Sequence, residues 1–169
     1  MVLSFWINAQ KRKSLIPQLD QWKKEGKKIV FTNGVFDILH VGHVSYLQKA
    51  KSLGDILIIG LNDDDSVRKL NKGPERPINN ELARKTVLEA LRAVDGVVIF
   101  KEETPLALIL SIQPDVLVKG GDYDPHQTDP AHKQYMVGSK EVRSWGGSLE
   151  VIDFVAGFST TAVVNKLKA

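Results

Sequence analysis

Short apolar runs alternate along this chain with stretches of helical period. The apolar runs are rich in Val and Ile and lack polar alternation, which is typical of strands buried on both faces of a sheet. We therefore predict five strands, at Lys28–Thr32, Asp55–Leu61, Gly96–Phe100, Val116–Lys119 and Leu149–Phe154.

The segments between these runs have the periodicity of helices. We predict helices at Leu15–Glu25, Val44–Leu53, Asp65–Leu70, Glu81–Val94, Pro105–Ile112, Lys140–Trp145 and Thr160–Lys168. End signals support several of them: Gly54 and Gly146 stand where a C′ glycine is expected, Thr104 precedes Pro105 as an N-cap, and Ser159 can cap the last helix.

Alternating strands and helices with short connections predict an α/β fold. We expect a single Rossmann-like, doubly wound domain with a five-stranded parallel sheet and helices on both faces. Residues 1–27 would form an N-terminal helical extension, and residues 28–169 the main domain. Ligands of such folds bind at the carboxyl ends of the strands, where the strand order reverses, so the loop after the first strand is the leading candidate site. Residues 71–79 and 122–137 are predicted to be irregular surface loops, of a length that is often functional or mobile.

That first loop carries a glycine and histidine pattern suited to phosphate. Gly34 lets the backbone approach a ligand, and Gly42 leaves a helix N-terminus uncovered, where N–H groups and partial positive charge favour anions. His40 and His43 can point toward one anion and stabilise charge on a phosphoryl group. The loop has neither the P-loop nor the G-x-G-x-x-G spacing.

Two other interpretations of the histidines remain open. The pair could cap and pack a helix start, or it could bind a metal. A zinc site would need a third ligand, and His126 and His132 lie in a distant polar loop.

Composition narrows the classes of function. The 169 residues include no cysteine, which excludes a disulfide scaffold, a thiolate metal site and a cysteine nucleophile. The net charge of +3, from 23 basic and 20 acidic residues, is compatible with an anionic small-molecule substrate. Basic residues at 11–13, 23–24 and 27–28 keep nucleic-acid binding as an alternative, although a solvated helix face explains them better. No apolar run approaches the ~20 residues of a membrane span, so we expect a cytoplasmic protein without membrane or nucleic-acid partners.

The stretch GVFDILHVGH at Gly34–His43 resembles the GxFDxxHxGH motif of the cytidylyltransferase-like nucleotidyltransferases. The resemblance extends over nearly all of Lys28–Lys168. Within that group, further segments are similar to the adenylyltransferase domain of bacterial ADP-heptose biosynthesis. They are FTNGVFDILHVGHVSYL, Arg76-Pro77-Ile78-Asn79 with Arg84, Val118–Tyr123, Gly138–Val142 and Phe158–Thr161.

This resemblance implies transfer of AMP from ATP to D-glycero-β-D-manno-heptose 1-phosphate, giving pyrophosphate and ADP-heptose, a precursor of the lipopolysaccharide core. Magnesium would be carried on the phosphates rather than by protein side chains. The implied partners are ATP, the sugar 1-phosphate and a separate upstream sugar kinase, since no kinase domain is present here. A homodimer is expected because dimers are the commonest oligomers.

Two further functions are open. One is a cytidylyltransferase for glycerol 3-phosphate or a related polyol or amino-alcohol phosphate, although the arginine typical of glycerol-phosphate enzymes is absent from Phe154–Gly157. The other is a regulatory module that binds nucleotide without turnover.

The resemblance also assigns roles to individual residues. His40 and His43 would hold and polarise the triphosphate, Arg84 would reach the β- or γ-phosphate, and Lys119 would meet the α-phosphate or the sugar phosphate. Arg84 could instead be a surface charge and Lys119 a solvated strand end. Residues expected to bind nucleotide or phosphate are Thr32, Asn33, Gly34, Phe36, Asp37, Gly42, Asn62, Ser159, Thr160 and Thr161; those expected to bind the second substrate are Arg76, Gly121 and Asp122.

Overall fold

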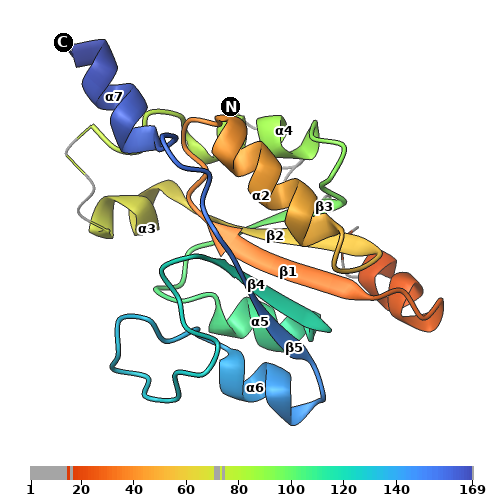
Figure 1. Ribbon diagram of the computed structural model, residues 1–169. Coiled ribbons are helices and arrows are strands. Elements are labelled where there is room, and N and C mark those ends of the chain that lie inside the picture. The colour runs from red at the N-terminus through yellow and green to blue at the C-terminus, as the bar shows by residue number, and fades with distance from the viewer. Residues whose placement is uncertain (1–14, 16, 71–72, 74, 169) are drawn as a thin grey trace.

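The computed structural model describes residue 15 and residues 17–70, 73 and 75–168. Five parallel strands form one sheet in the order β3-β2-β1-β4-β5 (Figure 1). This confirms the predicted α/β fold and all five strands, whose ends lie within two residues of the predicted ones. The strands are β1 (Ile29–Gly34), β2 (Ile56–Asn62), β3 (Gly96–Phe100), β4 (Val116–Gly120) and β5 (Ser148–Ile152).

Every predicted helix is present. They are residues 17–24, α2 (Val41–Lys51), α3 (Asp64–Lys69), α4 (Glu81–Glu89), α5 (Leu106–Ile112), α6 (Ser139–Ser144) and α7 (Thr160–Lys168). Helix α4 ends five residues before the predicted Val94, because the chain continues in tight turns: Leu91 N donates to the Leu88 carbonyl and Val94 N to the Leu91 carbonyl.

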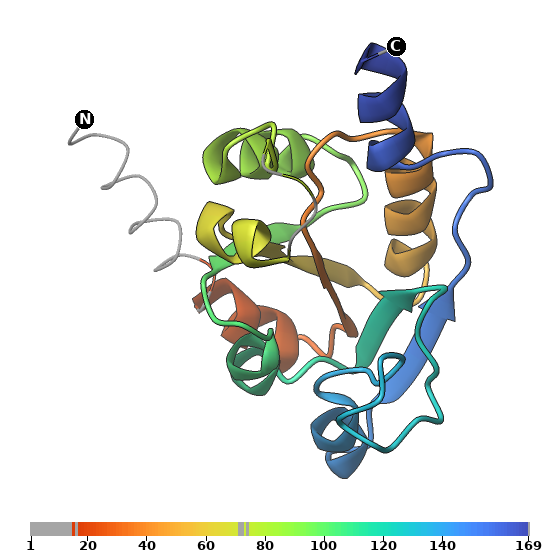
Figure 2. The same ribbon diagram turned by 90° about the vertical axis from the view of Figure 1, so that its left-hand side faces the viewer.

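Helices cover both faces of the sheet (Figures 1 and 2). Helices α2 and α4 pack on one face, where their residues Leu47 and Leu88 meet Val30 of β1. Helices α5 and α6 and residues 17–24 pack on the other face, where Leu19 lies in the cluster that contains Phe31. Burial of both faces explains why the strands carry no polar alternation.

The strand order reverses between β1 and β4, which is where ligands of such folds bind. The chain runs outward from β1 through β2 to β3 and then returns to β4 and β5, so the order reverses at the β1–β4 boundary. The first loop leaves the sheet at this boundary. The start of α7 returns to it, where Thr160 Oγ1 donates to the Ile38 carbonyl at 3.4 Å.

Two of the predicted helix ends are wrong. Helix α2 ends at Lys51 with Ser52 as its C-cap, so Gly54 is not a C′ residue. A Cβ on Gly54 would lie 2.7 Å from the Lys28 carbonyl oxygen, which requires glycine for close approach to the start of β1. The N-cap of α5 is Pro105 itself rather than the residue before it.

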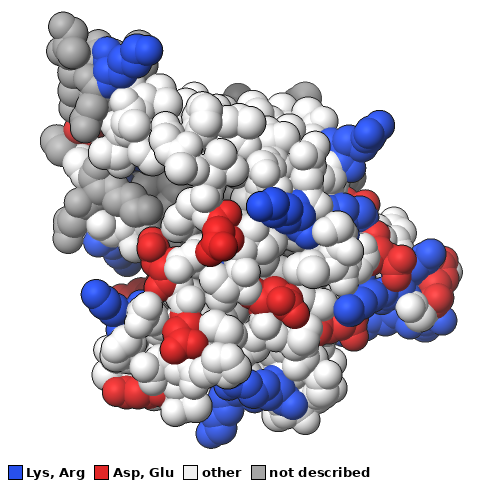
Figure 3. All heavy atoms as spheres, in the orientation of Figure 1, with Lys and Arg blue, Asp and Glu red and all other residues white. Residues whose placement is uncertain are grey.

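Two other predicted ends are confirmed. Gly146 follows α6 with φ +83°, and Ser159 Oγ accepts from Ala162 N at 3.0 Å at the start of α7. Basic residues 11–13, part of the nucleic-acid alternative, lie outside the described residues. On the face drawn in Figure 3, acidic and basic side chains are interspersed. Within the described ranges, no helix has the length and apolar character needed to cross a membrane.

Candidate active site

Two imidazole rings stand at the entrance of α2. His40 is the N-cap residue, with φ −143° and ψ 173°, and His43 lies in the first turn. The rings stack with centroids 4.0 Å apart and planes 26° apart. The spacing noted in the sequence thus brings both rings to one point beside the N-terminus of α2, an 11-residue helix.

Aromatic rings flank this pair. The Phe36 ring lies 5.4 Å from His43, and the Phe158 ring lies 6.4 Å from His40. Phe36 is buried and has φ +47°, a left-handed conformation that costs a non-glycine residue on the order of 1–3 kcal/mol. A Cβ on Gly34 would lie only 3.0 Å from this ring, so glycine leaves the space that Phe36 occupies.

The surroundings of His40 suit a ligand-binding group. Its Nδ1 atom is buried and has no hydrogen-bond partner among the described residues. Burial lowers the pKa of His40 below its usual 6.5, so the ring is neutral at neutral pH and offers one N–H donor. Because buried polar atoms are normally hydrogen-bonded, this ring nitrogen is a candidate contact for a bound molecule.

Lys119 lies across the β1–β4 boundary from the first loop. Its Nζ donates to Asn33 Oδ1 and lies 5.1 Å from the centroid of the Tyr123 ring. Both partners are neutral, and burial lowers the pKa of Lys119 to about 8. An anion bound nearby would favour the protonated form, so this buried ammonium is well placed to bind phosphate.

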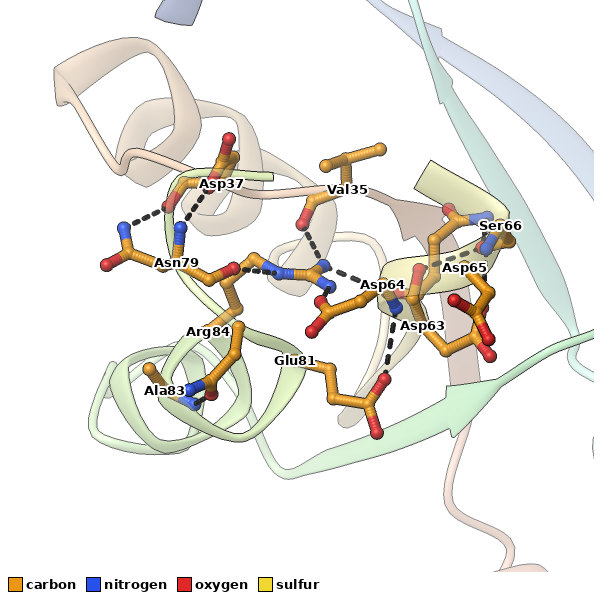
Figure 4. Close-up of polar contacts among 12 residues, drawn as sticks. Val35, Asp37, Asp63, Asp64, Asp65, Ser66, Asn79, Glu81, Ala83 and Arg84 are labelled. Carbon is orange, nitrogen blue, oxygen red and sulfur yellow. Dashed lines mark hydrogen bonds and ion pairs between the residues drawn. The ribbon is translucent and has the colours of Figure 1, made fainter. Parts of the chain in front are cut away.

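Asp37 fastens residues 76–79 to the first loop. Its Oδ2 accepts from Arg76 Nε at 2.5 Å and from Ile78 N at 2.9 Å, and its Oδ1 accepts from Asn79 N at 2.9 Å. The Asn79 side chain donates back to the Asp37 carbonyl at 2.8 Å (Figure 4). Arg76, expected from the sequence to meet the second substrate, thus directs its Nε to Asp37.

Arg84 is buried rather than a surface charge, with 2% of its surface exposed. Its Nε donates to the Asn79 carbonyl at 2.9 Å, and its Nη1 donates to the carbonyls of Val35 and Asn62 at 2.7 and 2.9 Å. Its Nη2 pairs with Asp64 Oδ1 at 2.6 Å (Figure 4). Four of its five N–H groups therefore donate to protein atoms.

The other predicted nucleotide-binding residues fall into two groups. Thr32 and Asn62 are buried: Thr32 Oγ1 lies 2.7 Å from the Tyr46 hydroxyl, and Asn62 Nδ2 donates to Ser66 Oγ at 3.2 Å. Ser159 caps α7, and Thr160 and Thr161 begin it, near the first loop, where Phe158 reaches His40. Helix α7 therefore supplies a second N-terminus close to the imidazoles.

The two remaining residues expected at the sugar site, Gly121 and Asp122, directly follow β4 and are exposed. They lie two and three residues beyond Lys119 and precede the loop 124–137. The structure therefore brings the first loop, Lys119 and the start of α7 together, and leaves Gly121 and Asp122 at the outer side of the same strand end.

Two residues at the site lie outside the predicted set. Tyr46 pairs with Thr32, and burial raises the pKa of this phenol. Phe158 is half-exposed and adjoins His40. Tyr46 follows His43 by three positions, a helical spacing that places the two on neighbouring parts of one helix face and could have identified it. Phe158 belongs to a segment that resembles the family, but nothing in the sequence indicates its contact with His40, because that contact depends on the return of the chain from β5.

The described residues contain no group of three or more His, Cys, Asp or Glu side chains arranged to hold a metal ion. Asp37, the carboxylate within the first loop, already accepts from three protein donors.

Comparison with known proteins gives concordant results. The profile of the family described as cytidylyltransferase-like matches residues 31–165. The chain is 51% identical over 156 residues to the bifunctional protein HldE of Syntrophotalea carbinolica, and 55% identical over 145 residues to that of Geobacter metallireducens. These matches cover 92% and 86% of this chain but only 30% and 28% of the relatives.

Solved structures agree in fold. A lipopolysaccharide core biosynthesis protein from Thermoplasma volcanium superposes with a TM-score of 0.58 at 29% identity, over 76% of this chain and 97% of the other. A pantoate-β-alanine ligase from Francisella tularensis superposes with a TM-score of 0.52 at 16% identity, over 90% of this chain and 75% of the other. At that identity the second likeness concerns the fold alone.

Proposed function

The chain belongs to the cytidylyltransferase-like family, and from this premise we propose that it is an adenylyltransferase that acts on D-glycero-β-D-manno-heptose 1-phosphate. The products would be ADP-heptose and pyrophosphate. The observation that carries the proposal is the stacked pair His40 and His43, with centroids 4.0 Å apart beside one helix N-terminus. Lys119 contacts Asn33 at the end of β1, just before the first loop. Identities of about half to proteins named HldE support the choice of nucleotide and acceptor.

In the proposed reaction, a phosphate oxygen of the sugar 1-phosphate attacks the α-phosphorus of ATP in line. A new phosphorus–oxygen bond forms as the bond to the β-phosphate oxygen breaks, and pyrophosphate leaves. The nucleophile is already an anion at neutral pH, so the protein needs to supply orientation and charge stabilisation rather than a covalent intermediate.

The residues of the site divide this work. His40 and His43 donate to the triphosphate, where charge develops on the leaving pyrophosphate. Lys119, buried among neutral groups, attracts the α-phosphate or the sugar phosphate. The starts of α2 and α7 add backbone dipoles directed at the phosphates. Magnesium carried by the phosphates would neutralise part of their charge.

The decisive experiment is an acceptor screen. Pyrophosphate release is measured with ATP and with CTP, each against heptose 1-phosphate, other sugar 1-phosphates and glycerol 3-phosphate. We expect release with ATP and heptose 1-phosphate, and a product of the mass of ADP-heptose. Release only with CTP and a polyol phosphate would replace the proposal with the cytidylyltransferase alternative. Tight ATP binding without release from any acceptor would identify a regulatory module instead.

The proposed reaction also requires an upstream source of the sugar 1-phosphate. The 1-phosphate substrate must come from a kinase that phosphorylates the sugar, acting before this domain. We propose a homodimer located in the cytoplasm, to be checked by the sedimentation mass of the protein at micromolar concentration and by cell fractionation.

A further inference from the structure

Arg84 takes no direct part in the phosphate site as the structure places it. Arginine frequently recognises a phosphate through two parallel N–H groups. Four of the five N–H groups of Arg84 already donate to Val35, Asn62, Asn79 and Asp64, which leaves only one. The guanidinium of Arg84 therefore binds groups of the protein itself.

The acceptors of Arg84 belong to four separate segments. Val35 lies in the first loop, Asn62 ends β2, Asn79 belongs to the segment fastened by Asp37, and Asp64 begins α3 (Figure 4). Three of these contacts are to backbone carbonyls. They therefore hold the backbone of these segments in place, whatever side chains the segments carry. Arg84 lies in α4. It thus links this helix to the carboxyl ends of β1 and β2, to the start of α3 and to the segment that contains Asn79.

The strained residue Phe36 lies between Val35, which Arg84 holds, and Asp37, which residues 76–79 hold. On one side, the carbonyl of Val35 accepts from Arg84 Nη1 at 2.7 Å. On the other side, the carboxylate of Asp37 accepts from Arg76 and from backbone N–H groups of residues 78 and 79. A left-handed non-glycine residue persists only where its surroundings enforce the conformation, and these two anchors supply the enforcement.

The conformation of Phe36 determines where its ring lies. The ring fills the space above Gly34 and lies 5.4 Å from His43 at an interplanar angle of 59°. His43 in turn stacks on His40. A continuous series of contacts therefore runs from Arg84 through Val35 and Phe36 to the two imidazoles.

We propose that Arg84 is a positioning residue, which holds Phe36 in its left-handed conformation and thereby sets the orientation of the His43 and His40 rings. This assignment rests on the proposed function only in that the imidazoles are taken to contact phosphate. It differs from the role expected from the sequence, in which Arg84 itself touches the β- or γ-phosphate.

The test is Arg84→Lys, which keeps the charge but loses the forked geometry. The matched control is Arg68→Lys, because Arg68 also pairs with an aspartate, Asp65, but is exposed. In the absence of nucleotide, we expect the imidazole proton resonances of His40 and His43 to move in Arg84→Lys and to remain unchanged in Arg68→Lys. Resonances that stay in place in both variants would overturn the assignment, whatever the outcome of the acceptor screen.

Kinetics give a second readout once the wild type is shown to turn over. Arg84→Lys should lower kcat by roughly 10- to 100-fold, the effect of misplaced catalytic groups, with a smaller change in KM for ATP. A rise in KM of about tenfold at unchanged kcat would instead indicate a direct phosphate contact and refute the proposal.

A measurement on the wild-type protein covers the case in which Arg84→Lys does not fold. The ¹⁵Nε resonance of Arg84 is followed while a non-hydrolysable ATP analogue is added. We expect it to stay in place, because the group remains bonded to Asn79, while the imidazole resonances shift. A shift of the Arg84 resonance as large as those of the imidazoles would show that the guanidinium meets the nucleotide, and would disprove the positioning role.

Discussion

His40 and His43 stack face to face at the entrance of α2, with ring centroids 4.0 Å apart. Two positive charges at this separation would repel each other strongly in a partly buried site. Burial lowers the pKa of His40, so that at neutral pH this ring contributes an N–H donor without a charge. The two rings can thus lie in contact before a polyanion binds, without strong charge repulsion between them.

The first prediction concerns these two rings. His40→Ala and His43→Ala should each lower turnover by roughly 100-fold, the usual effect of removing one donor to a developing negative charge. The free energy of unfolding should change by no more than about 1 kcal/mol, because neither ring lies in the central core. Pyrophosphate release and thermal denaturation measure the two effects.

The exposed histidines of the loop 122–137 supply the controls. His126→Ala and His132→Ala change the same residue type on the surface and should leave turnover within twofold of the wild type. Full activity in either His40→Ala or His43→Ala would remove that residue from the mechanism.

The second prediction follows from the pKa of Lys119, which burial lowers from 10.5 to about 8. As the pH rises through 8, the side chain loses its charge, so ATP affinity should fall between pH 7 and 9. At pH 8 the bound triphosphate should restore the charge, and binding should take up a proton. Calorimetric titrations in buffers of different ionisation enthalpy measure this uptake.

Lys119→Arg keeps the charge across this range and should abolish the proton uptake, whereas Lys101→Met, at an exposed position after β3, should preserve it. Equal proton uptake in Lys119→Arg and the wild type would assign the titration to another group.

The lowered pKa of Lys119 also makes the free energy of unfolding of the nucleotide-free protein depend on pH. Because the folded-state pKa of Lys119 lies below that of the unfolded chain, the unfolded state binds more protons between pH 8 and 10.5. The contribution of this group to stability therefore rises with pH over that window, by about 3 kcal/mol in total. The difference in unfolding free energy between the wild type and Lys119→Met should follow this curve in denaturant titrations, and a difference independent of pH would contradict it.

The sequence was sufficient for the sheet, since strands buried on both faces must be apolar throughout, as in Ile56–Leu61. It was also sufficient to locate the histidine pair, whose spacing is local. It was insufficient for Arg84, whose acceptors lie 5, 20, 22 and 49 residues away along the chain. Phe36 was expected at the site, but its positive φ depends on anchors from other segments.

The third prediction concerns Gly42. A Cβ at this position would lie 3.0 Å from the His40 ring, so Gly42→Ala should displace the ring and lower kcat by roughly tenfold. Alanine is the better helix former, and the free energy of unfolding should stay equal or rise by up to about 1 kcal/mol. Gln48→Ala, at an exposed position in the same helix, is the control and should keep full activity. A Gly42→Ala variant with wild-type kcat would show that the ring position is unimportant.

The fourth prediction concerns two left-handed residues, Gln113 and Gly146, which end α5 and follow α6. Gln113 has φ +48° and is exposed, so Gln113→Gly should raise the free energy of unfolding by about 0.5–1 kcal/mol. Gly146 has φ +83°, and a Cβ added there would meet no atom within 4 Å, so Gly146→Ala should lower it by about 1 kcal/mol through backbone strain alone. For a chain of this size the midpoint of thermal unfolding should shift by about 2–4 °C per kcal/mol, in opposite directions for the two variants. Turnover should not change in either variant, because Gln113 and Gly146 lie before the amino ends of β4 and β5, whereas the site lies at the carboxyl ends of the strands. A lower free energy of unfolding in Gln113→Gly would mean that the glutamine side chain makes contacts that outweigh the backbone strain.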